Sequence, residues 1–213
     1  ITGTNGKTTV AFMVRNILKS VGVRTGMIGT IEYDIGSRVM PATRTTPESL
    51  ELQNMLQQMC LARCEACVME VSSHALEQYR VEAVDFDMGV FTNLTQDHLD
   101  YHGNMESYFA SKKKLFDLLD EDKGVFVNLD DEYGARLMAA GRVSYGFNEN
   151  AMVRAREIEL DGFGTQLLLE SVEGLTEIKL PFIGRHNIYN ALAAYSVARS
   201  MGVEAEDISQ ALS

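Results

Sequence analysis

The chain has 213 residues, of which 46% are hydrophobic and 23% charged, and its formal net charge is −11. This length suits one sizeable domain, and no apolar run approaches the ~20 residues that cross a bilayer. The negative charge disfavours a nucleic-acid or anionic-membrane surface, so any phosphate binding has to be local.

The chain opens with a glycine-rich loop, Gly3-Thr4-Asn5-Gly6-Lys7-Thr8-Thr9, that runs directly into an apolar helical pattern. The glycines let backbone N–H groups close around phosphates, and the helix N-terminus adds a positive field. Lys7 can reach the terminal phosphates, and the Thr8 hydroxyl can ligate Mg²⁺. The general P-loop has Gly where this chain has Ile1, so the match is to a shorter variant. A glycine-capped turn before an ordinary helix is the alternative, and we predict nucleotide binding.

Beyond this loop, apolar periodicity and turn residues predict strands that alternate with helices. Strands are expected at residues 25–31, 66–71, 86–92, 124–127 and 143–147, with a short hairpin at 32–40. Helices are expected after the loop and at 46–59, 97–119, 131–140, 187–201 and from about 207. Thr46 is the expected N-cap of the second helix, with Pro47 at its first helical position.

The pattern changes after residue 150, where strands at 152–160, 165–172 and 176–180 are joined by turns at 161–164 and Gly174. This spacing is typical of an antiparallel meander. The expected fold class is α/β, with a doubly wound, mainly parallel sheet and P-loop, plus a small antiparallel β meander. Ligands of such sheets bind beyond the carboxyl ends of the strands.

The three cysteines, Cys60, Cys64 and Cys67, have the C-x3-C-x2-C spacing of some iron–sulfur sites. Cys60 lies near the end of a predicted helix and Cys67 begins a predicted strand, so the three would not converge on one loop. We expect buried, reduced thiols of a cytosolic protein.

Polar residues follow two of the predicted strands. Glu70 ends the strand at 66–71, where P-loop proteins have an acid that holds Mg²⁺, and a surface charge at a strand end is the alternative. Residues 97–102 contain two His and two Asp and could supply a divalent-metal ligand. The alternative is a helix N-terminus capped by Asp97, with solvent-facing histidines. The lysine run 112–114 would by default be a solvated helix face.

Six segments occur in the order GTNGKTT, TTPESLELQ, MEVSSHALEQYRV, NLTQDHLDYHG, YFASKKKLF and GRHNIYNALAA. Together they resemble the central domain of the Mur ligases, the ATP-dependent amide-bond-forming enzymes of peptidoglycan synthesis. MEVSSHAL with DHLDYHG is most similar to the MurE type, which adds the third residue of the stem peptide to UDP-N-acetylmuramoyl-L-alanyl-D-glutamate. The resemblance extends over essentially the whole chain.

The resemblance implies roles for residues around the phosphates. The Gly3–Thr9 loop would hold the ATP phosphates, and Glu70 and His98 would ligate Mg²⁺ with Thr8 nearby. Lys112 falls where the family has a lysine carbamylated by CO₂, a change that turns a cation into an anionic oxygen ligand. The neighbouring lysines, 113 and 114, would favour the neutral amine that CO₂ attacks.

Other positions would bind the organic parts of the substrates. The UDP-muramoyl-dipeptide would contact five residues: Thr45, Thr46, Ser72, Gln78 and Arg80. Asn187 and Asn190 would lie on the adenine side of ATP, and polar positions near a helix start are the alternative. Arg44 stands where the family often has Asn, and its role is undetermined.

The implied reaction begins with attack of the D-Glu side-chain carboxylate on the γ-phosphate of ATP, which gives an acyl phosphate and ADP. The amine of a diamino acid then displaces phosphate, while Mg²⁺ and Lys7 neutralise charge. We expect a cytoplasmic monomer whose partners are ATP, the UDP-muramoyl-dipeptide and a diamino acid, with no nucleic acid or membrane. The alternatives are a ligase of the folylpolyglutamate or cyanophycin synthetase type, or a non-catalytic ATP-binding module.

A P-loop normally follows a buried strand, and here two residues precede Gly3. We therefore expect residues 1–213 to be the central ATP-binding domain of a longer protein. The family's N-terminal UDP-binding and C-terminal amino-acid-binding domains would lie outside this chain. On its own it should bind ATP weakly and not ligate. Whether meso-diaminopimelate or L-lysine is added cannot be determined from these residues.

Overall fold

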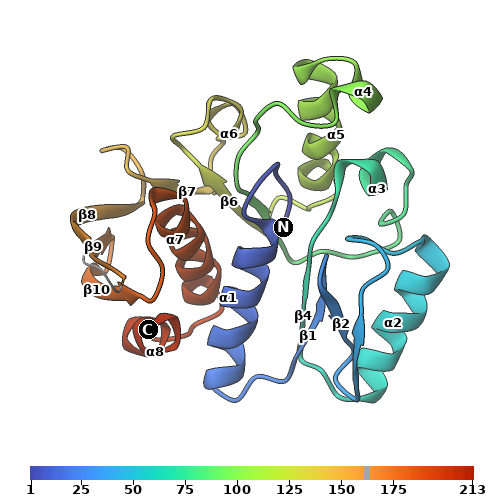
Figure 1. The fold of residues 1–213 in the computed structure, drawn as a ribbon, viewed down its shortest axis with the longest axis horizontal. Helices are drawn as coiled ribbons and strands as arrows, with labels where there is room; N and C mark the ends of the chain where they lie inside the picture. Colours follow the sequence, from blue (N-terminus) through green and yellow to red (C-terminus); the bar gives the residue numbers. More distant parts are fainter. Residues whose placement is uncertain (161–163) are drawn as a thin grey trace.

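Strands and helices alternate through most of the computed structural model, which describes residues 1–160 and 164–213 (Figure 1). The strands are β1 Thr25–Ile28, β2 Glu32–Asp34, β3 Val39–Pro41, β4 Ala66–Met69, β5 Met88–Phe91, β6 Gly124–Asn128, β7 Val143–Gly146, β8 Val153–Leu160, β9 Thr165–Ser171 and β10 Gly174–Leu180. The helices are α1 Lys7–Ser20, α2 Ser49–Leu61, α3 Ser73–Glu77, α4 Leu99–His102, α5 Met105–Asp117, α6 Glu132–Arg136, α7 Arg185–Ser200 and α8 Ala205–Leu212.

The strands form two sheets, in the orders β3-β2-β1-β4 and β10-β9-β8-β7-β6-β5. Residues Ile1 and Thr2 lie between β4 and β5 and join the two sheets. The Ile1 amine donates to the Met69 carbonyl, and the Ile1 carbonyl accepts from Val71, both at 2.8 Å. Thr2 makes the corresponding bonds with the β5 side, at 2.8 and 3.0 Å. The glycine loop therefore starts at the centre of a nearly continuous sheet.

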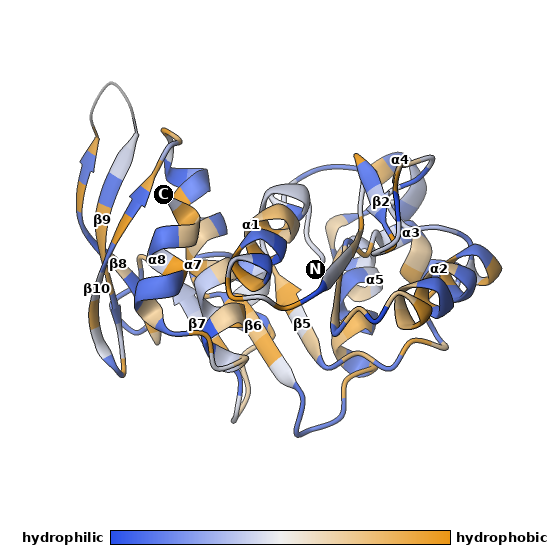
Figure 2. Ribbon diagram, turned by 90° about the horizontal axis from the view of Figure 1, so that it is seen from below, coloured by the Kyte–Doolittle hydropathy of each residue, from blue (hydrophilic) through white to orange (hydrophobic). Residues whose placement is uncertain are grey.

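Both faces of this sheet are covered, as expected for buried parallel strands. On one face, α1, α7 and α8 pack against side chains that include Val90 and Phe126. On the other, α2, α3 and α5 pack against side chains that include Phe91, Val125 and Val127. Successive strand residues thus alternate between two cores, and Figure 2 shows β5 and β6 as predominantly hydrophobic. The predicted doubly wound α/β fold is confirmed.

The small antiparallel meander is also confirmed, because β8 pairs with β9 and β9 with β10 in antiparallel fashion. The hairpin expected at 32–40 is formed by β2 and β3. The turn expected at 161–164 falls mostly outside the described residues. Among the helices that the structure describes, none is long and apolar enough to cross a membrane.

The stretch 97–119 is mostly helical as expected, and it forms two helices because Gly103 at φ 78° ends α4 and Asn104 caps α5. Two other local expectations were wrong. Thr46 does not cap α2, because Glu48 is the N-cap and Thr46 is buried with its hydroxyl bonded to the Glu70 carbonyl at 2.9 Å. The cysteines are free thiols as expected, but Cys60 and Cys67 are exposed.

Candidate functional site

The glycine loop follows Ile1 and Thr2, the two residues that lie between β4 and β5, and it leads directly into α1. Gly6 has φ 88°, and a Cβ on it would collide with the Asn190 side chain. A Cβ on Gly3 would collide with the Thr92 hydroxyl, so both positions require glycine for close approach. By helix geometry, the backbone N–H groups of the first turn of α1 lack intrahelical acceptors and can bind an anion.

The segment after β5 holds this loop in place. The Thr4 N–H donates to the Asn93 carbonyl at 2.8 Å, and the Asn5 N–H donates to the Asn93 side-chain oxygen at 2.9 Å. The Thr92 hydroxyl donates to the Asn5 carbonyl at 2.6 Å. Because four of these bonding groups lie on the polypeptide backbone, the loop conformation is fixed before any ligand arrives.

Two lysines share one carbonyl oxygen at this loop. Lys7 Nζ donates to the carbonyls of Gly3 and Thr4 at 2.9 and 2.8 Å, and Lys112 Nζ donates to the Gly3 carbonyl at 2.8 Å. Lys112 is 1% exposed, and its Nζ lies 4.6 Å from the centre of the Tyr108 ring. Burial, with a smaller effect of the Lys7 charge, lowers the pKa of Lys112 to about 6.

This environment suits a lysine that reacts as a neutral amine, but the neighbouring lysines do not create it. Lys113 forms an exposed ion pair with Asp117, and Lys114 pairs with Glu77 at 2.9 Å. The expectation that these two lysines favour the neutral amine was therefore wrong. Burial and Lys7 have that effect instead.

Glu70 is a buried carboxylate surrounded by donors from two segments. It is 1% exposed and accepts from the Thr8 hydroxyl at 2.9 Å. The Thr30 N–H and hydroxyl donate to it at 2.8 and 3.0 Å. The alternative of a surface charge at a strand end is excluded. Sequence reasoning missed Thr30, which follows the strand paired with β4 and so reaches the same sheet edge.

His98 is the N-cap of α4 and has a left-handed backbone, with φ 51°. Its half-exposed ring lies 6.3 Å from the Tyr108 ring, centre to centre, and its Nε2 is 3.5 Å from Asp97. Tyr108 therefore lies beside both His98 and Lys112. Its position one helical turn before Lys112 is the one sequence feature that could have selected it.

The oxygen atoms near the glycine loop are too few to hold a metal ion by themselves, but they suit a Mg²⁺ ion that is also bound to phosphates. Within residues 1–160 and 164–213 no group of three or more His, Cys, Asp or Glu side chains could hold a metal ion. Next to the loop, the Glu70 carboxylate is hydrogen-bonded to the hydroxyls of Thr8 and Thr30. The Asp97 carboxylate is near enough to act on the pKa of Lys7 and of Lys112. Mg²⁺ commonly takes one or two carboxylates and completes its shell with water and phosphate oxygens.

The five residues expected to bind the UDP-muramoyl-dipeptide form one network next to Glu70. Thr45 bonds the Thr30 hydroxyl at 3.1 Å, and Thr46 accepts from the Ser72 N–H at 3.0 Å. Arg80 donates to the Thr46 carbonyl at 3.0 Å and also bonds the Gln78 side chain.

Glu48 extends this network to Arg44, the residue whose role the sequence left undetermined. One Glu48 oxygen pairs with Arg44 and lies 3.1 Å from Arg80. Arg44 and Glu48 are both more than half exposed. Arg44 thus places a second guanidinium beside the Arg80 network, on its solvent side.

A cavity of about 600 Å³, lined mostly by residues with polar side chains, lies on the other side of the glycine loop. Its lining includes Gly6 and Asn190, together with Asp130 and Tyr189, which are joined by a hydrogen bond of 2.9 Å. Its size is in the range of nucleotide and other small-molecule sites. Asn187 does not line it, because its side chain donates to the Ile183 carbonyl at 3.1 Å. Asp130 follows β6 closely, a position at a strand's carboxyl end that could have identified it.

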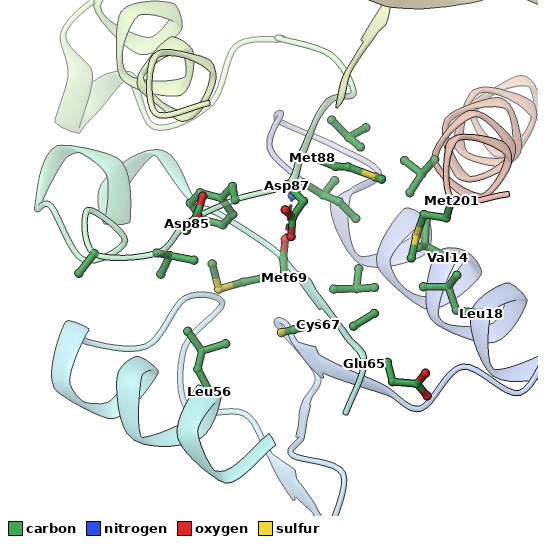
Figure 3. A pocket seen from close by; sticks show the side chains of 18 residues that line it. Val14, Leu18, Leu56, Glu65, Cys67, Met69, Asp85, Asp87, Met88 and Met201 are labelled. Atoms are coloured by element: carbon green, nitrogen blue, oxygen red, sulfur yellow. Dashed lines mark hydrogen bonds between the residues drawn. The ribbon is translucent and has the colours of Figure 1, made fainter. Parts of the chain in front are cut away.

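An apolar cavity of about 380 Å³ lies at the opposite end of the strands (Figure 3). It lies between the amino ends of β4 and β5, and its lining includes Ile1, Met69, Met88 and Met201. Three acidic residues, Glu65, Asp85 and Asp87, also line it (Figure 3). None of the residues of the Gly3–Thr9 loop lines this cavity, so it is distinct from the proposed phosphate site.

Residues 1–198 match the family model of the Mur ligase middle domain. The UDP-N-acetylmuramoyl-L-alanyl-D-glutamate--2,6-diaminopimelate ligase of Geobacter metallireducens is 44% identical over 98% of this chain and 42% of its own length. The enzyme of the same name from Caldanaerobacter subterraneus subsp. tengcongensis is 42% identical over 100% of this chain and 44% of its own length. The chain therefore spans less than half the length of these relatives.

Solved structures agree with this similarity. One structure of a UDP-N-acetylmuramoyl-L-alanyl-D-glutamate--2,6-diaminopimelate ligase has a TM-score of 0.88 and 28% identity, over 99% of this chain and 44% of that one. The MurF ligase from Thermotoga maritima in complex with ADP has a TM-score of 0.74 and 18% identity, over 98% and 47%. At 18% identity the second likeness concerns the fold alone.

Proposed function

The chain belongs to the Mur ligase middle-domain family, and we propose that it is the ATP-binding part of a peptidoglycan-precursor ligase. The ligase adds a diamino acid, of the 2,6-diaminopimelate class that its relatives' names specify, to UDP-N-acetylmuramoyl-L-alanyl-D-glutamate. The reaction takes place in the cytoplasm, where ATP is available and thiols stay reduced. The ligands are small molecules, and we expect a monomer.

The position of Glu70 is the observation that best supports this proposal. Its side chain accepts from Thr8, at the end of the phosphate loop, at 2.9 Å. Its backbone carbonyl accepts from Thr46, in the proposed muramoyl-dipeptide site, at 2.9 Å. One buried residue thus lies between the two proposed sites and contacts both, so the sites are adjacent. Direct transfer of a phosphoryl group needs two substrates bound next to each other.

The residues near the loop would act on charge and position. Lys7 is placed to leave its two carbonyl partners and bind the terminal phosphates. Glu70, Thr8 and His98, with Lys112 as its carbamate, would hold Mg²⁺, which neutralises charge on the phosphates. The neutral amine of Lys112 at pH 7 supports carbamylation.

The proposed chemistry has two displacements. The D-Glu side-chain carboxylate attacks the γ-phosphorus, the bond to the β-phosphate oxygen breaks, and an acyl phosphate and ADP result. The amine of the diamino acid then attacks the acyl carbon, and phosphate leaves as the amide forms. Thr45, Thr46, Ser72, Gln78 and Arg80 would orient the muramoyl-dipeptide.

Residues 1–213 are proposed to be the central domain of a longer ligase, with UDP-binding and amino-acid-binding domains on either side. The apolar cavity between the amino ends of β4 and β5 supports this, because a strand leading into Ile1 would lie there and pair with both edges. A chain extended at its N-terminus should accordingly resist urea better than residues 1–213. Residues 1–213 alone should bind ATP weakly and not ligate.

The proposal is tested with the full-length protein, ATP, Mg²⁺ and UDP-N-acetylmuramoyl-L-alanyl-D-glutamate. Production of ADP and of the UDP-tripeptide is followed by mass spectrometry with meso-diaminopimelate or L-lysine. We expect product with one diamino acid and none with the Glu70→Gln variant. Extension of a folate by glutamate, or nucleotide hydrolysis that prefers GTP and needs no UDP-substrate, would contradict the proposal.

A further inference from the structure

His102, the second histidine of the DHLDYHG segment, is the last residue of α4 and contacts both α3 and α5. Figure 1 shows these three helices on the same side of the molecule. Its Nε2 is 2.9 Å from the Ser73 hydroxyl of α3, and its Nδ1 is 3.2 Å from the Ser111 hydroxyl of α5. Both serines are 1% exposed. The ring also stacks on Tyr108, with centres 4.9 Å apart. One imidazole therefore bridges two helices through buried hydroxyls.

The acceptor at the end of this chain fixes the direction of its hydrogen bonds. The Ser111 hydroxyl lies 2.6 Å from Glu77 Oε1, and an ionised carboxylate can only accept. That carboxylate is ionised, since its bonds with Ser111 and Lys114 hold the pKa of Glu77 below its usual range. The Ser107 carbonyl, 3.0 Å from the Ser111 hydroxyl, can likewise only accept. The Ser111 proton therefore points to one of these two acceptors, Glu77 being the nearer, and the Ser111 oxygen is left to accept from His102.

The tautomer of His102 follows from this direction. Its Nδ1 must bear the hydrogen in order to donate to Ser111, so Nε2 has a lone pair and accepts from the Ser73 hydroxyl. Burial lowers the pKa of His102, which keeps the ring neutral at pH 7. The bonds run from Ser73 through His102 and Ser111 to Glu77, and we call these four residues the serine–histidine relay.

Each end of the relay is adjacent to a residue of the proposed site. Ser73 follows Ser72, which bonds Thr46 in the proposed muramoyl-dipeptide network. Ser111 precedes Lys112, whose Nζ reaches the phosphate loop at Gly3. A shift of His102 would therefore change the distance between the substrate side and the lysine side of the site.

We propose that His102 is a positioning residue for the ligase reaction: as its Nδ1–H tautomer it holds the Ser72–Ser73 turn and the Lys112 helix at a fixed separation. This inference rests on the proposed function, because it assigns the relay to the alignment of the two substrates. The hydrogen bonds of the relay do not themselves reach the Gly3–Thr9 loop, which is contacted by the neighbouring Lys112 and Tyr108.

The direction of the relay is tested without catalysis. Full-length protein labelled with ¹⁵N in histidine is examined by NMR at pH 7.5, and the His102→Gln variant identifies the signals of His102. We expect Nδ1 to be the protonated ring nitrogen and Nε2 the unprotonated one. The opposite tautomer, or a ring protonated at both nitrogens, would overturn the relay.

The positioning role is tested by steady-state kinetics of the His102→Ala and His102→Asn variants. Misplacement by about 1 Å costs on the order of 100-fold in rate, so His102→Ala should lower kcat by about that factor and change KM for ATP much less. An Asn amide can donate to Ser111 from near the Nδ1 position, so His102→Asn should recover part of the loss and remains informative if the Ala variant does not fold.

Glu106→Gln is the matched control on α5, because it breaks the exposed ion pair with Arg136 on another face of that helix. Its Tm should fall slightly, with kcat unchanged. The positioning role would be refuted if His102→Ala had the kcat of the wild type. It would also be refuted if His102→Ala and Glu106→Gln had the same Tm and lost the same fraction of kcat. If the wild type does not ligate, the proposed function fails and the positioning role with it, whereas the NMR result still decides the tautomer.

Discussion

Replacing Lys112 by Met should stabilise residues 1–213 at neutral pH, although it removes a residue of the proposed site. Lys112 is 1% exposed and its pKa is lowered to about 6 from 10.5. At pH 7 the unfolded chain holds a proton that the folded chain lacks. Removing a proton at pH 7 from a lysine with a pKa of 10.5 takes about 3.5 pH units, at about 1.4 kcal/mol each. The burial of Lys112 therefore lowers the free energy of unfolding by roughly 5 kcal/mol at pH 7. Loss of the hydrogen bond to the Gly3 carbonyl offsets about 1 kcal/mol, so a net gain of roughly 4 kcal/mol is expected.

The pH dependence gives the sharper test. Between pH 6 and 10.5 the unfolded wild type binds one more proton than the folded wild type, so its free energy of unfolding rises with pH by about 1.4 kcal/mol per pH unit on account of Lys112. The Met variant lacks this contribution. The stability difference between variant and wild type should therefore shrink by roughly 3 kcal/mol from pH 7 to pH 9.

Urea unfolding followed by circular dichroism at pH 7, 8 and 9 measures this difference. The buffers are depleted of CO₂ and contain a chelator, so that the lysine remains an unmodified amine. Lys113→Met is the matched control, because Lys113 forms an exposed pair with Asp117 and its replacement should change stability by less than about 0.5 kcal/mol. A difference for Lys112→Met that stays constant from pH 7 to 9 would show that Lys112 keeps its proton, and the reasoning from burial would be wrong.

Three other substitutions test the site. Gly6→Ala should lower the free energy of unfolding by at least about 1 kcal/mol and weaken binding of an ATP analogue, because φ at Gly6 is 88° and the new Cβ would collide with Asn190. Urea unfolding measures the first effect, and titration calorimetry measures the second. Glu70→Gln in the full-length protein should weaken binding of Mg²⁺–ATP by on the order of 10–100-fold and leave metal-free ATP binding unchanged, as titration with and without chelator would show. Arg44→Asn should change the free energy of unfolding by less than about 0.5 kcal/mol, because its pair with Glu48 is more than half exposed; a larger loss would mean that the pair is structurally important.

The sequence sufficed for the family, the fold class and the order of the elements. Strand residues buried on both faces leave a nearly continuous apolar run, and such runs located β4, β5 and β6 to within a few residues. Glu70 was selected because it follows the carboxyl end of β4. The structure shows that it is buried and that it accepts a hydrogen bond from Thr8. The roles of the site residues in binding and catalysis stay predictions.

Thr46 shows why local patterns failed elsewhere. Thr-Pro-Glu before an apolar run has every feature of a helix start, and capping is worth about 1 kcal/mol. The same hydroxyl instead bonds the Glu70 carbonyl and the Ser72 N–H, both at the end of a distant strand. Buried backbone groups left without partners cost 1–3 kcal/mol each, so the tertiary contact outweighs the cap. A single sequence contains no information about those two groups.

The local charge at the phosphate loop explains how a chain of net charge −11 can bind a polyanion. Lys7 and Lys112 both donate to the Gly3 carbonyl, and each has its pKa lowered chiefly by burial. Two cations at one carbonyl would repel each other, so the Lys7 charge helps to lower the pKa of Lys112 to about 6, whereas the buried Glu70 carboxylate acts to raise that of Lys7. A triphosphate beside these lysines would favour their protonated forms, and a carbamate at Lys112 would place an anion beside Lys7. In either case the added negative charge interacts with Lys7 and Lys112, which are already buried in the folded chain. The affinity for a polyphosphate therefore depends on this loop rather than on the charge of the whole surface.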